Sequence, residues 1–271
     1  MMPNPNADAQ EARLDELLEI LRHERPAYAR LPRPDTPQEK RRLFRSLVNV
    51  RPPMPASARF LALQDAFLQE ETRRKGVTDY RALSPAQAGL YLWQGDITTL
   101  QCDAIVNAAN SALLGCFAPC HGCIDNAIHT FAGVQLRAAC AELMAAQGAE
   151  EPTGRAKITP AFNLPCRYVL HTVGPIVRGA VTAQDDALLA ACYRACLDLA
   201  AENGLRSVAF CCISTGEFHF PNERAANIAL QTVRAWQQAH PASIEVIFNV
   251  FKSSDFEIYR RLLAADGTAP A

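Results

Sequence analysis

The sequence lacks any run of about 18 uncharged apolar residues, the length that a helix needs to cross a bilayer. It also lacks an excess of either charge, because 27 Lys and Arg residues stand against 28 Asp and Glu residues. A net charge of -1 gives no general attraction to nucleic acid or to an anionic membrane. The N-terminal stretch MMPNPNADAQEARLDE is polar and acidic rather than basic and then apolar. We therefore expect a cytoplasmic protein without nucleic-acid or membrane partners.

Internal repeats and low-complexity tracts are absent as well. The chain has 271 residues, a length that suits one large or two small domains. Its composition of 49% hydrophobic and 20% charged residues is typical of globular proteins. Ten cysteines are unusual, but they do not follow the spacings of a small secreted disulfide framework. The cysteines are therefore expected to be reduced.

Residues 1–85 are predicted to form a helical extension. An amphipathic helix covers residues 11–25, a second begins after Thr36-Pro37, and a third runs from a Ser57 cap to a stop at Gly76. The second helix carries four basic residues, which we interpret as a solvated helix face, with a nucleic-acid patch as the alternative. These residues are Lys40, Arg41, Arg42 and Arg45.

From residue 86 to residue 271 the pattern changes to short apolar runs that alternate with helical periodicity. This alternation predicts an α/β fold with a largely parallel sheet covered by helices on both faces. The tail after Ala265 is expected to be frayed. Strands are predicted at 90–93, 104–106, 155–159, 168–173, 208–213 and 246–251, and helices near 125–147, 184–203, 221–239 and 254–264.

The densest group of reactive side chains lies just after the strand at 104–106. Cys116, His121 and Cys123 are spaced C-x₄-H-x-C, and thiolate and imidazole donors at this density indicate a Zn²⁺ site. The alternatives are buried thiols that serve only packing, or a redox pair of Cys120 and Cys123. Three ligands would leave a position open for catalysis, whereas Cys120 as a fourth would close the site. Neighbours in the chain point apart, so we expect Cys120 to stay outside.

Four strings carry a family resemblance: WQGDITTLQCDAIVNAANSALLGCF, CIDNAIHTFAGVQLR, YVLHTVGPI and ISTGEFHFP. From about Leu90 to Leu263 the chain resembles the zinc-containing branch of the macrodomain family, whose members remove ADP-ribose from modified proteins. The resemblance implies a macrodomain-like sheet between helices, zinc, and a mono-ADP-ribosylated protein as substrate. It makes an ester to Asp or Glu the expected linkage and a sirtuin-type ADP-ribosyltransferase system a possible partner.

The resemblance also assigns residues to ADP-ribose. The Asp96 carboxylate would accept a hydrogen bond from the exocyclic amine of adenine, and the Ile97 amide would assist. Capping of a helix by Asp96 is an equal alternative. Asn107 and Asn110 would surround the distal ribose, with turn capping as the alternative. Phe251 would stack on adenine, against the default of a core residue. Backbone amides of the loop after the strand at 208–213 would hold the diphosphate. That loop contains Ser214, Thr215, Gly216, Glu217 and Phe218.

Asp125, at the start of the helix after the Cys-rich loop, is the expected catalytic residue together with Asn110. The resemblance implies that the carboxylate orients or activates water, and a helix N-cap is the alternative. His129 and His171 are expected to support the site or to pack in the core. Two rival functions remain open: a reader module that binds ADP-ribose around a structural zinc, and a redox or metal-storage protein.

Overall fold

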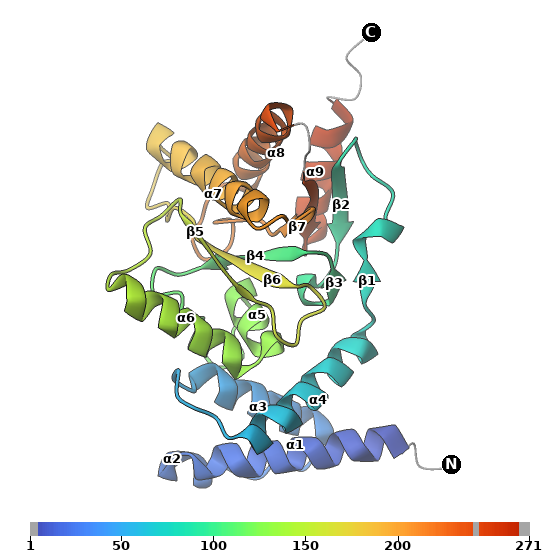
Figure 1. The fold of residues 1–271 in the computed structure, drawn as a ribbon, viewed down its shortest axis with the longest axis vertical. Helices are drawn as coiled ribbons and strands as arrows, with labels where there is room; N and C mark the ends of the chain where they lie inside the picture. The colour runs from blue at the N-terminus through green and yellow to red at the C-terminus, as the bar shows by residue number, and fades with distance from the viewer. Residues whose placement is uncertain (1–4, 241–243, 266–271) are drawn as a thin grey trace.

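The computed structural model describes residues 5–240 and 244–265, and the prediction for the tail after Ala265 lies outside these residues. Its centre is a six-stranded sheet with strand order β2-β8-β7-β4-β6-β5 (Figure 1). All neighbours pair in parallel except β5, which lies antiparallel to β6 at one edge. The predicted α/β class with a largely parallel sheet is therefore confirmed. The strands are β2 (Leu90–Gln94), β4 (Ala104–Ala109), β5 (Ala156–Pro160), β6 (Tyr168–Val173), β7 (Ser207–Phe210) and β8 (Glu245–Val250).

The central strands β4, β6, β7 and β8 are buried on both faces, which explains their nearly continuous apolar sequences. Two predicted strand ends were wrong. The strand from Ala104 extends to Ala109, because it pairs with β6 along its whole length. The strand that was predicted to reach Ile213 ends at Phe210, where the chain turns into a loop.

Helices cover both faces of the sheet. In Figure 1, α5 and α6 lie on the side that faces the N-terminal helices, and α7 and α8 lie on the other side. The single helix predicted near residues 125–147 was wrong, because the chain breaks at Gly133, where φ is +96°. A Cβ atom there would meet side-chain atoms of Gln135 and Gln64 at 2.6 Å. The helices are α5 (Ile124–Ala132), α6 (Val134–Gln147), α7 (Ala183–Glu202), α8 (Asn222–Ala239) and α9 (Ser253–Ala265).

The predicted N-terminal helical region is present as four helices, and a connecting segment leads from them to the sheet. Thr36 forms a capping box with Glu39, Ser57 caps the next long helix through the Phe60 amide, and Gly76 ends it. The helices are α1 (Pro5–His23), α2 (Pro26–Ala29), α3 (Pro37–Val50) and α4 (Ala58–Lys75), followed by β1 (Thr78–Asp79), η1 (Tyr80–Ala82), η2 (Ile97–Thr99) and β3 (Leu100–Gln101).

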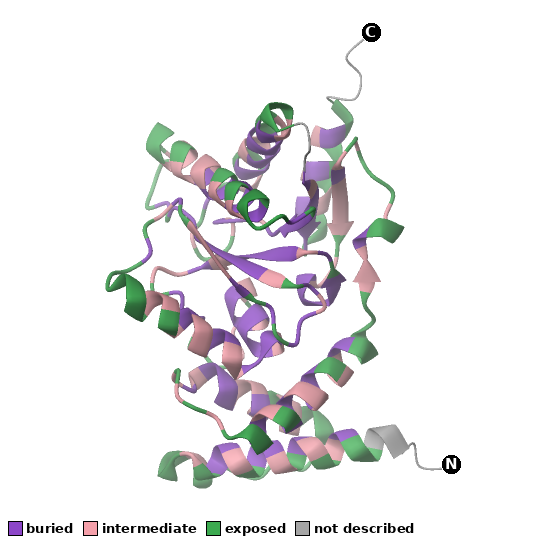
Figure 2. Ribbon diagram, viewed as in Figure 1, coloured by how far each residue is buried: buried purple, intermediate pink, exposed green. Residues whose placement is uncertain are grey.

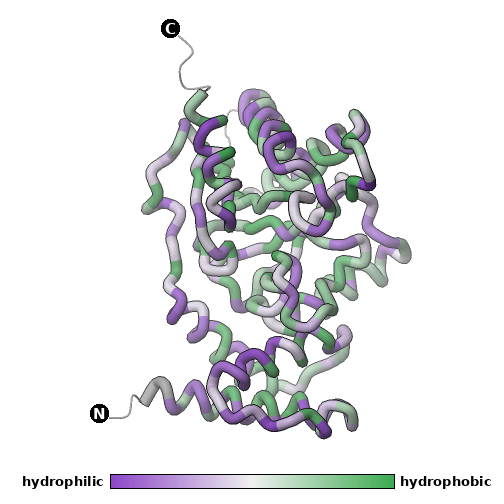
Figure 3. Tube along the Cα trace, turned by 180° about the vertical axis from the view of Figure 1, so that it is seen from behind, coloured by the Kyte–Doolittle hydropathy of each residue, from purple (hydrophilic) through white to green (hydrophobic). Residues whose placement is uncertain are grey.

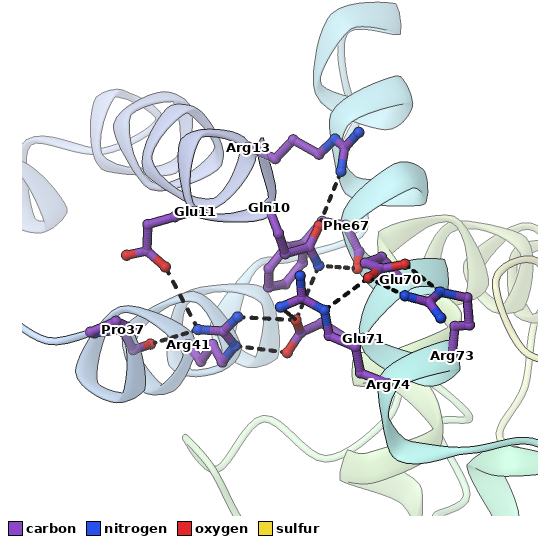
Figure 4. A network of polar contacts seen from close by, with 10 residues as sticks. All are labelled: Gln10, Glu11, Arg13, Pro37, Arg41, Phe67, Glu70, Glu71, Arg73 and Arg74. Atoms are coloured by element: carbon purple, nitrogen blue, oxygen red, sulfur yellow. Dashed lines mark hydrogen bonds and ion pairs between the residues drawn. The ribbon is translucent and has the colours of Figure 1, made fainter. Parts of the chain in front are cut away.

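Polar contacts hold α1, α3 and α4 together (Figure 4). Gln10 of α1 donates to the Phe67 oxygen at 2.8 Å and to Glu71 at 3.0 Å, and Arg41 of α3 binds Glu71 through two nitrogens. Lys40 pairs with Glu11 and Asp15. The prediction of a solvated basic face was therefore wrong for Lys40 and Arg41, whose side chains form ion pairs with α1 and α4. The spacing of residues within α3 gives no information about partners on other helices.

Two groups of buried apolar side chains fill the molecule, one among α1, α3 and α4 and one around the sheet (Figure 2). Phe131 of α5 packs against both groups, so the helical region rests directly on α5. Figure 3 shows hydrophobic and hydrophilic residues alternating along the N-terminal helices. The domain boundary between residues 85 and 86 stays a prediction. None of the described helices has the length and hydrophobicity that a bilayer-spanning segment requires.

Candidate active site at the carboxyl ends of the strands

Asp125 lies in the first turn of α5, beyond the end of β4. Its two carboxylate oxygens accept hydrogen bonds from Asn107 at 2.8 Å and from Asn110 at 3.2 Å, and its side chain is only 7% exposed. The N-cap of α5 is Cys123, whose sulfur accepts from the Asn126 amide. The alternative in which Asp125 caps the helix was therefore wrong, and the carboxylate is instead held by two amide side chains.

Burial sets the charge state around this carboxylate. Desolvation raises the pKa of Asp125 to about 6, against the opposing effect of the Asn107 hydrogen bond. The Nε2 atom of His129, one turn further along α5, lies 3.5 Å from Oδ1 of Asp125. Burial lowers the pKa of His129 well below its usual range, so the imidazole is neutral. The pair is therefore a close contact and not an ion pair.

A chain of hydrogen bonds continues from Asp125 into the core. Asn107 is fully buried, and its amide nitrogen also lies 3.2 Å from Nδ1 of His171. Nε2 of His171 in turn lies 2.9 Å from the Thr159 hydroxyl. Asn107 thus supports Asp125 from behind rather than from the surface. Asn110 is half-buried, and its oxygen also accepts from the Ala112 amide, so it caps the turn as well.

The three predicted metal ligands converge. The ligand atoms of Cys116, His121 and Cys123 all lie within 4.8 Å of one another. Nδ1 of His121 is buried and has no hydrogen-bond partner in the described part of the chain. An unpartnered imidazole nitrogen beside two sulfurs fits a zinc ion. Burial raises the pKa of the Cys123 thiol to about 12, so without a cation this sulfur would be protonated and unreactive.

Cys120 does not belong to this converging group. Its sulfur donates to the main-chain oxygen of Arg42 at 3.4 Å, and its backbone has a left-handed φ of +55°. The thiol therefore contacts α3 and not the three donors. This agrees with the expectation that Cys120, as the neighbour of His121, would stay outside the metal site. This arrangement also weighs against a redox pair of Cys120 and Cys123.

A second group of potential ligands lies deeper, formed by His129, Cys140 and His171. Both ring nitrogens of His171 already have partners in Asn107 and Thr159. All three residues are buried, and burial lowers the pKa of His171 to about 4. We therefore regard this cluster as part of the support behind Asp125.

The N-terminal region contacts the loop that carries Cys116, His121 and Cys123, which we call the ligand loop. Arg45 of α3 donates to the His121 oxygen at 2.9 Å and to the Asn126 side chain at 2.7 Å. Asn49 accepts from the Cys120 amide at 2.9 Å. Asn126 closes the arrangement by donating to the Ala118 oxygen. Arg45 is thus a third basic residue for which the predicted solvated face was wrong.

Arg137 of α6 ties the same region together from inside. It is 4% exposed and donates to the main-chain oxygens of Leu114, Val48 and Arg51. Its guanidinium also lies 4.2 Å from the ring centre of Phe117. One buried cation therefore connects the ligand loop with the end of α3.

The loop after β7 has the geometry expected for an anion cradle. The amides of Gly216, Glu217 and Phe218 donate no hydrogen bond within the described residues. Ser214 has a left-handed φ of +64°, and its buried hydroxyl has no partner there. Thr215 is anchored through its hydroxyl to the Cys212 oxygen at 3.0 Å. Several donors thus remain available in one short loop.

This loop and the ligand loop face each other. Oε1 of Glu217 lies 3.6 Å from Nε2 of His121. The loop expected at the diphosphate therefore lies next to the three convergent donors.

The three residues expected at adenine follow β2 and β8. Asp96 caps η2 by accepting a hydrogen bond from the Thr98 amide, which is the alternative role predicted for it. Its other carboxylate oxygen accepts a hydrogen bond from Lys75 at 2.9 Å. The Ile97 side chain is buried. Phe251 is 77% exposed just after β8, so the alternative of a core phenylalanine was wrong. Contact of Asp96, Ile97 or Phe251 with adenine stays a prediction.

A parallel sheet between helices, with a carboxylate and an amide-rich loop at the carboxyl ends of its strands, is the architecture of a macrodomain. A Macro domain family model matches residues 106–229. The chain is 55% identical over 252 residues to a protein-ADP-ribose hydrolase of Treponema medium, covering 92% of this chain and 97% of that protein. This protein belongs to the macrodomain family.

Two further comparisons cover most of the chain. A protein-ADP-ribose hydrolase of Staphylococcus aureus strain MRSA252 is 46% identical over 260 residues, with 95% of this chain and 97% of that protein covered. The crystal structure of a Trypanosoma brucei macrodomain in complex with ADP-ribose superposes with a TM-score of 0.63 at 30% identity, over 85% of this chain and 97% of that one.

Several residues that shape the site were not recognised in the sequence. Asn126 follows Asp125 directly and could have been suspected from its place at the helix start. Arg45, Asn49 and Arg137 gave no signal, because their partners lie more than 20 residues away in the chain.

Proposed function

We propose that this protein is a zinc-dependent hydrolase that removes mono-ADP-ribose from modified protein side chains, with Asp or Glu esters as the target linkage. The observation that carries the proposal is the placement of Asp125. Its carboxylate is fixed by Asn107 and Asn110 at the start of the same helix that Cys123 caps. The names of the hydrolase relatives and the ADP-ribose bound to a related macrodomain support this assignment.

Cys116, His121 and Cys123 would hold the zinc ion. Zinc supplies Lewis acidity there, toward a ribose hydroxyl, the leaving oxygen or a water molecule. The free amides after Ser214 bind the diphosphate, and the exposed ring of Phe251 is available to adenine. These contacts fix the distal ribose, so that the scissile bond is held beside Asp125.

Asp125 acts on the attacking water. With both oxygens already held by amide groups, the carboxylate cannot rotate. It orients the water and accepts its proton as the water oxygen bonds to the anomeric carbon of the distal ribose and the carboxylate of the carrier side chain leaves. Asn110, which is half-buried, shares this role at the ribose, whereas the fully buried Asn107 holds Asp125 from behind.

The test is release of ADP-ribose from a protein modified on glutamate, with protein modified on arginine or serine as comparison. Wild type should release ADP-ribose from the glutamate-linked substrate. Asp125→Asn should lower the rate by at least about 100-fold while ADP-ribose still binds. Cys123→Ala should lose zinc and activity together. Glu142→Gln, an exposed change on α6, serves as the control.

A wild-type protein that binds ADP-ribose without releasing it from any of the three substrates would instead be a reader module. The redox or metal-storage alternative requires more than one metal per chain or a reversible disulfide. Elemental analysis should find a single zinc ion, and mild oxidant should leave its content unchanged.

A further inference from the structure

Glu217 is the one residue of the expected diphosphate loop that the proposed function does not explain. A carboxylate repels a diphosphate, yet this one lies among the amides that should bind it. Its side chain is 69% exposed, and Oε1 lies 3.6 Å from Nε2 of His121 in the opposite loop. The position therefore needs a role that is directed away from the nucleotide.

The two nitrogens of His121 have different surroundings. Nδ1 is buried and has no hydrogen-bond partner among residues 5–240 and 244–265, and His121 belongs to the group whose ligand atoms converge. Nε2 faces Glu217. An imidazole that binds a metal through one nitrogen carries its proton on the other, and that proton is commonly donated to a carboxylate. The surroundings thus favour Nδ1 as the metal ligand and Nε2–H as the donor.

We propose that Glu217 is a positioning residue for the metal site. In the zinc-loaded protein its carboxylate closes the 3.6 Å separation, accepts a hydrogen bond from Nε2–H of His121 and selects the tautomer in which Nδ1 binds zinc. The proposal rests on the zinc site of the proposed function. Glu217 is not itself a ligand, because its carboxylate is not among the converging donor atoms in the described residues.

This contact also joins the two loops of the site. Glu217 lies among the amides expected at the diphosphate, and His121 lies in the loop that Arg45 holds from α3. By binding His121, the carboxylate is directed away from the diphosphate, so the acidic residue and the anion cradle become compatible.

Zinc affinity, measured by competition with a chromogenic chelator, tests the proposal. Outer partners of metal-bound histidine contribute about 10- to 100-fold to affinity, and we expect the lower end, about tenfold, for Glu217→Ala because the contact is partly exposed. Glu217→Gln should lose less, since its amide oxygen still accepts a hydrogen bond. Glu142→Gln is the matched control and should bind zinc like wild type.

Two readouts separate this role from a general structural one. In a His121→Ala background, where two thiols still bind zinc weakly, Glu217→Ala should have no further effect. In the zinc-loaded wild type, NMR should detect a slowly exchanging Nε2 proton on His121, which exchanges rapidly in Glu217→Ala.

Wild-type zinc affinity in Glu217→Ala, or an equal loss in the His121→Ala background, would overturn the inference and leave the proposed function intact. A wild-type chain that binds no zinc would overturn both.

Discussion

Arg45 and His121 are 76 residues apart in the chain, and yet an Arg45 nitrogen donates to the main-chain oxygen of His121 at 2.9 Å. The same guanidinium reaches the Asn126 side chain at 2.7 Å. A helix of the N-terminal region therefore fixes the backbone of the loop that carries the expected zinc ligands.

Replacing Arg45 with alanine should loosen that loop without unfolding the sheet. Hydrogen bonds from a charged group contribute about 1.5–3 kcal/mol, and a loss of about 1.4 kcal/mol weakens binding tenfold. Arg45→Ala should therefore weaken zinc binding by about tenfold in a chelator competition. Arg42→Ala, on the exposed side of the same helix, is the control. If Arg42→Ala and Arg45→Ala bind zinc equally well, the helix does not position the loop.

Arg137 should matter for folding more than for metal binding. Arg137→Ala would leave the oxygens of Leu114, Val48 and Arg51 buried without their donor. Each such group costs about 1–3 kcal/mol, so we expect the variant to lose roughly 3 kcal/mol and about 5–10 °C of Tm. Arg260→Ala, at an exposed ion pair with Glu257, should leave Tm unchanged in the same calorimetric scan. Equal Tm values for the two variants would contradict this role.

His171 should lower the stability of the protein in mild acid relative to neutral pH. Burial lowers its pKa to about 4 from 6.5, so between these pH values the unfolded chain binds a proton that the folded chain does not. The contribution of His171 to the free energy of unfolding therefore falls by roughly 3 kcal/mol as the pH drops from 6.5 to 4. Asp125, whose pKa burial raises to about 6 from 3.8, contributes with the opposite sign over part of this range. His129 contributes with the same sign as His171, and Asn107, Thr159 and Cys140 also face the His171 ring.

Urea unfolding of the zinc-free protein between pH 7 and 4 measures this dependence. His171→Gln should remove the contribution of His171, so its stability should be less unfavourably affected by the drop in pH than that of wild type, while His129 and Asp125 still contribute. A slope equal to that of wild type would remove His171 as the cause.

Gly174 should control the diphosphate loop. A Cβ atom at this position would overlap the Ser214 hydroxyl and lie 2.8 Å from a methyl group of Ile213. Gly174→Ala must therefore move these two side chains, and we expect the loop to shift with them. We expect at least tenfold weaker ADP-ribose binding by calorimetry, since misplaced amides lose their hydrogen bonds to the anion. Adding Ser214→Gly should restore part of the affinity. Unchanged binding by Gly174→Ala would show that the loop does not hold the nucleotide in this position.

Much of the sheet could be predicted because buried parallel strands read as apolar runs. Tyr168 to Val173 was predicted with the bounds that the structure has, since turn residues flank it. The break at Gly133 was missed because the apolar periodicity continues across it. The positive φ and the crowding by Gln64 and Gln135, which require a glycine there, appear only in the folded chain.

The candidate site could likewise be predicted only in part. Cys116, His121, Cys123 and Asp125 could be grouped because they lie within ten residues and on one loop-to-helix junction. Their supports could not, because a basic side chain on α3 gives no indication of its partner. Arg45 was assigned to solvent for this reason, although its partners lie in the ligand loop.

The bond between α3 and the ligand loop has a consequence for shortened forms of the chain. A fragment that starts at residue 86 would keep the six-stranded sheet, the amides after Ser214 and the ring of Phe251. It would lose the hydrogen bonds that Arg45 and Asn49 make to the ligand loop. Such a fragment should still capture the nucleotide while holding its cation poorly. Removal of one distant helical segment would thus separate recognition from cleavage, with every catalytic side chain still in place.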